Sequence, residues 1–139
     1  MWQFEHSVMV EWGDCDEAGV VFYPRYFYWF DASYQAWLRS LNLSQRTLRQ
    51  HFGVITPLVD VGATFLSPAT YDEQIVVRLK MQTWTTRRFQ LLYEVLKAEQ
   101  LIVSGHEWRA WASPLPDGGL KGSEAPAQLQ ALLMPPTNA

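Results

Sequence analysis

The sequence predicts an α+β domain in which one long helix packs against an antiparallel sheet. A single segment, residues 24–41, carries a long run of apolar side chains three and four positions apart, which is typical of an amphipathic helix. About five other segments alternate apolar and polar side chains with the period of two that half-buried strands show. The connections between the last three of these segments are short, which favours antiparallel neighbours.

Composition and charge restrict the class of protein. The chain has 139 residues, 48% of them hydrophobic, which suits a single globular domain over residues 1–139. The formal net charge of −3 provides no broad basic field, so we expect neither nucleic acid nor membrane as a partner. One cysteine excludes a disulfide within the chain and a cysteine-rich metal site. Since no stretch resembles a signal peptide or a membrane span, we expect a cytoplasmic protein.

The elements follow from these patterns in order. The first strand is predicted over residues 3–12, with Trp12 on its apolar face. Pro24 suits the first turn of the long helix, because its missing N–H would be unpaired there, and Asn42 can end that helix. A short second helix is expected over residues 44–52. The remaining predicted strands are residues 57–66, 74–83, 88–97 and 101–112. Residues 115–139 form a Pro- and Gly-rich tail that can close with a short helix, AQLQALL.

The segment GDCDEAGVVFY, residues 13–23, joins the first strand to the long helix and carries two acids. Asp14 is predicted to shape the turn. A helix N-terminus presents free N–H groups and a partial positive charge, and both stabilise an oxyanion. Pro24 has no N–H, so the backbone N–H of Tyr23 is the expected donor. Asp16, a few residues earlier, can be a turn residue that bonds the backbone two residues on. Alternatively, its carboxylate can reach a carbonyl held by this donor and either attack it or activate a water as general base.

This segment and the aromatic helix after it resemble the signature of hotdog-fold acyl-CoA thioesterases of the 4-hydroxybenzoyl-CoA thioesterase type. Six residues match the family pattern in order: Asp14, Asp16, Gly19, Val20, Val21 and Phe22. The segment TPLVDVGATFLSPATYDE, residues 56–73, is similar to the family's second strand and the following turn. The resemblance covers most of residues 3–113. It implies a hotdog fold, in which a sheet of about five antiparallel strands wraps around one central helix.

The resemblance also implies a mechanism and an assembly. Asp16 would be the catalytic carboxylate and the Tyr23 backbone N–H the group that polarises the thioester carbonyl. Active sites would lie at the interfaces of a homodimer or homotetramer. The substrate would be an acyl-CoA that is hydrolysed to a free acid and coenzyme A. Neither a cofactor nor a metal is expected, since coenzyme A is part of the substrate and no His has a metal-ligand spacing.

Several further residues are candidates for substrate contacts. Asp31 shares a helix face with Phe27 and Tyr34, which is unusual for an acid, and relatives place an acid here to contact the acyl group. The resemblance implies that Thr56 lines the acyl pocket from the partner subunit. Tyr26 and Trp29 can border a flat acyl group. Arg87 and Arg88 follow a predicted hairpin turn, where the family binds the phosphates of CoA. Arg25 and Lys80 are further basic candidates.

An aromatic acyl group is the preferred substrate prediction. The alternatives within the class are a short-chain acyl-CoA, an acyl-carrier-protein thioester and 1,4-dihydroxy-2-naphthoyl-CoA, because SYQAWLRS also resembles the dihydroxynaphthoyl branch. An alternative of another class is a non-catalytic hotdog module that binds an acyl thioester or a partner protein. Asp16 and the geometry of the helix start favour the enzyme.

Overall fold

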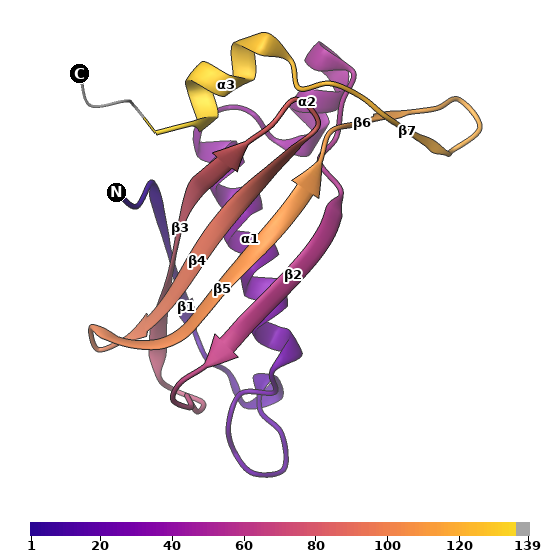
Figure 1. The fold of residues 1–139 in the computed structure, drawn as a ribbon. Helices are drawn as coiled ribbons and strands as arrows, with labels where there is room; N and C mark the ends of the chain where they lie inside the picture. The colour runs from indigo at the N-terminus through magenta and orange to yellow at the C-terminus, as the bar shows by residue number, and fades with distance from the viewer. Residues whose placement is uncertain (136–139) are drawn as a thin grey trace.

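The predicted arrangement of one long helix and an antiparallel sheet is confirmed by a computed structural model, which describes residues 1–135 (Figure 1). Five strands form the main sheet in the order β1-β3-β4-β5-β2, and all pairings are antiparallel. The strands are β1 (Phe4–Met9), β2 (Leu58–Phe65), β3 (Gln74–Trp84), β4 (Arg88–Lys97) and β5 (Gln100–Ala110). The helices are α1 (Pro24–Ser40), α2 (Gln45–Phe52) and α3 (Ala127–Leu133). Small elements are η1 (Trp12–Asp14), β6 (Ala112–Pro114) and β7 (Leu120–Gly122).

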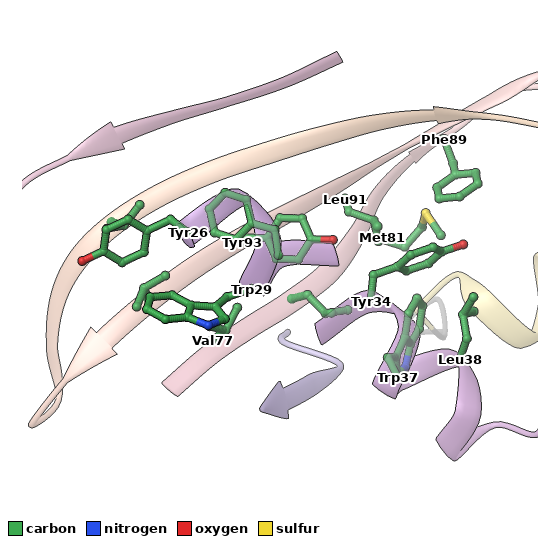
Figure 2. Packing of buried hydrophobic residues seen from close by; sticks show 14 of the residues in the cluster. Tyr26, Trp29, Tyr34, Trp37, Leu38, Val77, Met81, Phe89, Leu91 and Tyr93 are labelled. Atoms are coloured by element: carbon green, nitrogen blue, oxygen red, sulfur yellow. The ribbon is translucent and has the colours of Figure 1, made fainter. Parts of the chain in front are cut away.

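Helix α1 lies along one face of the sheet, and the core is the layer between them (Figure 1). Its aromatic side chains point at sheet residues such as Val77, Met81 and Leu91 (Figure 2). The rings of Phe30 and Tyr93 stack with centroids 4.4 Å apart. The helix ends at Ser40, and Asn42 then takes a left-handed φ of 59°, which breaks the helical path as expected.

The period-2 pattern of β3 and β4 is confirmed. In both strands alternate side chains are buried against α1 and the ones between them are half-buried on the outer face. The register Leu79↔Tyr93 places the two buried sets side by side. Gly105 of β5 has a packing reason, because a Cβ there would lie 2.5 Å from the Phe30 ring. The sheet can therefore approach α1 closely at this point.

Two strands differ from the predictions. The first strand ends at Met9, and Trp12 is 77% exposed in η1 rather than on the buried face of a strand. Glu11 and Asp14 form a reciprocal capping box that turns the chain away from the sheet before Trp12. Strand β2 is at the edge of the sheet, and its burial does not alternate as predicted: Val59 and Phe65 are 45% and 46% exposed, whereas Val61 and Ala63 of the same predicted face are half-buried against the core.

The predicted tail contains β7, which pairs with β6 just before the tail, and α3, whose Leu129 and Leu133 are fully buried. The last part of the tail, residues 136–139, lies outside the described residues. Over residues 1–135, none of the helices combines the length and the apolar character needed to cross a bilayer.

Candidate active site

The loop of residues 11–22 includes η1, leads to the start of α1 and is closed by backbone hydrogen bonds. Phe22 N–H donates to Asp14 O at 2.9 Å, and Cys15 and Val21 form a β-bridge. At the tip of the loop, Gly19 N–H donates to Asp16 O at 2.9 Å, and Gly19 has a φ of 82° that favours glycine. The loop is therefore a defined structure that ends at the N-terminus of α1 (Figure 1).

The two acids of this loop have opposite surroundings. Asp14 is 8% exposed, accepts the Glu11 N–H at 2.8 Å and forms an ion pair with Arg25 at 2.8 Å. It holds the turn, as the sequence predicted. Asp16 is exposed, and its Oδ1 accepts the Ala18 N–H at 2.9 Å. Within residues 1–135 its Oδ2 has no hydrogen-bond partner, so this oxygen is available for chemistry.

Asp16 lines an open depression of about 320 Å³. Its other lining residues are Trp12, Cys15, Glu17, Gly19 and Tyr71. The rings of Trp12 and Tyr71 lie 5.1 Å apart and both are exposed, at 77% and 41%. Sequence reasoning missed these two aromatics, because Trp12 fitted a strand pattern and Tyr71 lies in the turn before β3. The exposed rings make one wall of the depression apolar.

The N-terminus of α1 supplies a hydrogen-bond donor beside this loop. Arg25 N–H donates to Phe22 O at 2.9 Å and Tyr26 N–H donates to Tyr23 O at 3.1 Å. Pro24 has no N–H, and the Tyr23 N–H meets no acceptor in the described part of the chain. The predicted donor, the Tyr23 N–H, lies at the N-terminal end of α1, and the Asp16 carboxylate lies in the loop that leads into this end. The positive end of the helix dipole lies at the same point.

The two predicted acyl-contact residues, Asp31 and Thr56, are linked by a residue that sequence reasoning missed. Arg109 of β5 donates from Nη2 to Asp31 Oδ1 at 2.8 Å and from Nη1 to Thr56 O at 2.9 Å. The Asp31 side chain is 51% exposed. Thr56 is buried, and its hydroxyl bonds Tyr34 at 3.0 Å and Gln45 at 2.7 Å. The signal was present in the sequence, since Glu107 and Arg109 put two charges on one face of a predicted strand.

Burial dominates the electrostatics around Arg109. Burial raises the pKa of Tyr34 to about 12, and it raises the pKa of Tyr93 well above 10, with Glu107 adding to the effect. Burial also opposes the charge of Arg109, but the adjacent Glu107 carboxylate outweighs it and raises the pKa of the guanidinium. Both tyrosines therefore stay neutral, and the Arg109 guanidinium stays charged, over the ordinary pH range.

Tyr26 and Trp29, which were predicted to border the acyl group, are part of the core. They are 3% and 4% exposed, and their rings pack edge to face at 5.4 Å (Figure 2). They offer almost no surface to a ligand in this chain. Their remaining influence on a substrate would be through the shape of α1.

The basic candidates lie at different ends of the sheet. Arg87 and Arg88 are exposed at the β3–β4 hairpin, which follows Trp84. The other end of β3, Gln74, pairs with Met9 near the Asp16 loop. The 11 residues of β3 span roughly 33 Å, so Arg87 and Arg88 are far from Asp16 within one chain. Arg25 is at the Asp16 end, over the Tyr28 ring at 4.6 Å, whereas Lys80 lies over Trp2 at 4.8 Å.

Comparisons with known proteins identify the family and the fold. Residues 10–112 match the family model of the thioesterase-like superfamily, and the chain belongs to this family. It is 30% identical to 4-hydroxybenzoyl-CoA thioesterase of Pseudomonas sp. (strain CBS-3), over 85% of this chain and 88% of that protein. It is 29% identical to a 1,4-dihydroxy-2-naphthoyl-CoA hydrolase of Synechocystis sp., over 71% and 72% of the two chains. The structure of the Pseudomonas thioesterase superposes with a TM-score of 0.84 at 28% identity, covering 92% of this chain and 96% of that one. The predicted hotdog fold and enzyme class, thioester hydrolase, are confirmed.

Proposed function

We propose that this protein hydrolyses acyl-CoA thioesters with an aromatic acyl group to the free acid and coenzyme A. One observation carries the proposal: the Tyr23 N–H at the start of α1, which has no acceptor among residues 1–135, follows directly on a loop that presents the exposed Asp16 carboxylate. A thioester carbonyl bound there would have a hydrogen-bond donor for its oxygen and a carboxylate, as nucleophile or general base, near its carbon. The membership of the thioesterase-like superfamily supports this chemistry.

The reaction follows from these two groups. As the carbonyl oxygen gains charge, the Tyr23 N–H and the positive end of α1 stabilise it. Asp16 either attacks the carbonyl carbon to give a mixed anhydride that water then cleaves, or removes a proton from the attacking water. In both routes the C–S bond breaks and the CoA thiolate leaves. Water and the chain's own residues suffice for this reaction, with coenzyme A entering only as part of the substrate.

Two observations favour a hydroxylated aromatic acyl group. The similar proteins named above act on 4-hydroxybenzoyl-CoA and on 1,4-dihydroxy-2-naphthoyl-CoA, and both acyl groups are aromatic and carry hydroxyls. The exposed Asp31 carboxylate is an acceptor for such a hydroxyl. Short-chain acyl-CoA and acyl-carrier-protein thioesters are the alternatives, and neither makes use of Asp31.

The geometry also supports a homodimer, built through β2. This strand pairs only with β5 among residues 1–135, which leaves one edge of backbone groups free beside the exposed Leu58, Val59 and Phe65. If two β2 edges pair antiparallel about a two-fold axis, the partner's sheet runs in the opposite direction. The partner's β3–β4 hairpin, with its Arg87 and Arg88, then lies at the end of the sheet that holds Asp16. Basic side chains and the catalytic loop would meet only in the dimer, and two dimers can pair as a tetramer.

Thiol release from a panel of acyl-CoAs tests the proposal. The panel comprises 4-hydroxybenzoyl, benzoyl, 1,4-dihydroxy-2-naphthoyl and short-chain esters, together with one acyl-carrier-protein thioester. We expect hydrolysis of the aromatic esters, and a molar mass of at least two chains by light scattering. If the native protein binds these esters but releases no thiol, it is a non-catalytic acyl-thioester-binding module. A monomer with full activity would exclude a site completed by the partner.

A further inference from the structure

A buried ion pair lies between the sheet and α1, outside the catalytic loop. Arg109 and Glu107 of β5 are 4% and 1% exposed. Arg109 Nε donates to Glu107 Oε1 at 3.0 Å and Nη2 donates to Oε2 at 3.1 Å, so the ion pair is bidentate. Burying such a pair costs several kcal/mol of desolvation that a well-packed apolar pair would not. The pair therefore calls for an explanation other than stability.

The inner end of this cluster is fully occupied. Glu107 Oε1 accepts a second hydrogen bond from the Tyr93 hydroxyl at 2.6 Å. The Arg109 guanidinium lies over the Tyr34 ring at 4.5 Å. Because the guanidinium is planar and its donors have fixed directions, these contacts leave it one orientation. The orientation of Arg109 is thus fixed by its contacts with Glu107 and Tyr34, and Tyr93 holds Glu107 in place.

The outer end of the cluster is only half occupied. Arg109 Nη2 and Gln35 Nε2 both donate to Asp31 Oδ1, at 2.8 Å and 3.1 Å. Asp31 Oδ2 has no hydrogen-bond partner among the described residues, and the side chain is 51% exposed. Asp31 is eight positions after Tyr23, on the helix face of Tyr23 and Phe27, whose rings lie 6.5 Å apart. The open oxygen is therefore on the α1 face that starts at the oxyanion donor, about 12 Å along the helix.

We propose that Arg109, whose orientation is fixed by its ion pair with Glu107, is a positioning residue for Asp31. Arg109 binds one oxygen of the Asp31 carboxylate, so that the other oxygen accepts a hydrogen bond from a hydroxyl of the acyl group. This inference rests on the proposed function and extends it from the reacting carbonyl to acyl selectivity. The Asp31 carboxylate, held in place by Arg109, favours acyl groups that carry a hydroxyl donor. It disfavours acyl groups that leave the acceptor unpaired or that bring a second carboxylate.

The alternative role for the pair is to join β5, α1 and the segment before β2, without effect on selectivity. The two roles can be separated, because a matched apolar pair preserves packing but cannot hold Asp31. Replacement of a buried ion pair by hydrophobic residues of similar volume is often neutral or stabilising. The double variant Glu107→Leu/Arg109→Met should therefore fold while it releases the Asp31 carboxylate.

The experiment measures kcat/KM for 4-hydroxybenzoyl-CoA and for benzoyl-CoA, and uses their ratio as the selectivity. We expect the double variant to lower this ratio about tenfold or more, the size of one hydrogen bond to a charged group. Asp31→Ala should lower the ratio equally. In the Asp31→Ala background the double substitution should change the ratio no further, because Arg109 acts through Asp31.

A matched control is available on the opposite face of the sheet. Arg78 of β3 and Glu94 of β4 form a hydrogen-bonded ion pair there. The variant Arg78→Met/Glu94→Leu makes the same chemical change away from Asp31, and we expect an unchanged ratio. Arg109→Lys is the second test variant, since it keeps the positive charge but cannot form the bidentate ion pair with Glu107. It should lower the ratio even if the double variant folds poorly.

The outcomes separate this inference from the proposed function. An unchanged ratio in Arg109→Lys and in the double variant, with the native enzyme active, would overturn the positioning role. So would a further fall in the ratio when the double substitution is added to Asp31→Ala. If no ester is hydrolysed, the proposed function fails, and the same variants are compared by their affinity for non-hydrolysable thioether analogues of the two esters. Equal selectivity of binding in all variants would then reject the inference independently.

Discussion

The two parts of the proposed site are built in opposite ways. In the loop of residues 11–22, Asp16 is exposed and one of its oxygens has no partner in the described chain. In the Arg109 cluster, by which we mean Glu107, Arg109, Tyr34 and Tyr93, both Glu107 oxygens and three Arg109 nitrogens are engaged away from water. The loop offers an unsatisfied group to a substrate, whereas the cluster uses satisfied groups to hold a shape.

The difference shows how to read an acid in this fold. Asp14 and Asp16 are two residues apart, yet Asp14 bonds Glu11 and Arg25 with its two oxygens, whereas one Asp16 oxygen has no partner among residues 1–135. Asp31 combines both situations, with one oxygen on the buried Arg109 and the other open. Partners, rather than residue type, separate a group that reacts from one that positions.

The largest effect on activity is expected at Asp16. Asp16→Asn removes the nucleophile or base and should lower kcat/KM by about 10²- to 10⁴-fold, with an unchanged midpoint of thermal unfolding. Thiol release and differential scanning calorimetry measure the two quantities. Glu17→Gln is the matched control, because Glu17 is exposed in the same depression and loses the same charge. Activity of Asp16→Asn within a few-fold of native would show that the open acid is not catalytic.

In the Arg109 cluster, truncation of a side chain should lower the stability of the fold. Arg109→Ala leaves the Glu107 carboxylate buried without its partner, so the free energy of unfolding should fall by about 3–5 kcal/mol. Chemical denaturation gives this value. Arg78→Ala removes a comparable pair whose side chains are 28% and 23% exposed, and should cost about 1 kcal/mol or less. Equal losses in the two variants would remove the distinction between the buried and the outer pair.

Alkaline pH should weaken the closed cluster. The folded protein holds the Tyr34 proton up to a pKa of about 12, whereas a tyrosine in the unfolded chain has a pKa near its ordinary value of 10.0. Between these values the unfolded chain binds fewer protons, so the free energy of unfolding falls as pH rises and is independent of this group below pH 10. The slope is about 1.4 kcal/mol per pH unit for each such tyrosine.

Denaturation curves at several alkaline pH values test this slope. Tyr34→Phe should have a shallower decline than the native protein. Tyr28→Phe, at a position that is 58% exposed, should leave the decline unchanged. A native protein whose stability is constant up to a pH of about 12 would contradict the assignment of a buried, neutral Tyr34.

The smallest effect is expected at the closed acid of the loop. Asp14→Ala removes the capping bond to the Glu11 N–H and should cost about 1 kcal/mol. Since it also loosens the loop that carries Asp16, activity should fall, but by less than in Asp16→Asn. Arg25→Ala, which removes the ion pair to Asp14 and the contact with the Tyr28 ring but keeps the capping bond, serves as the comparison. If Asp14→Ala reduced activity as much as Asp16→Asn, the two acids would share the chemistry.

Much of the fold could be predicted because its signals are local. The periods of three to four in α1 and of two in β3 and β4 are set by burial of one face, and both were visible in the sequence. The exception, Trp12, followed the strand period but lies after the end of β1, within the capping box that Glu11 and Asp14 form around η1. At the site, Tyr23 could be proposed from its place before Pro24, and Asp16 from the resemblance of its segment to the family signature. The role of Arg109 could not, because its partners come from α1, β5 and the segment before β2.

By itself the sequence determined the elements, the loop that precedes α1 and the end of the helix at which an oxyanion can be held. These depend on neighbours along the chain, where spacing is fixed by covalent geometry. Only the tertiary structure decided that β2 lies at the edge, that Arg109 joins Asp31 to Thr56, and that Arg87 and Arg88 are at the opposite end of β3 from Asp16. Such facts depend on which distant segments pack together, and one stretch of sequence does not contain that information.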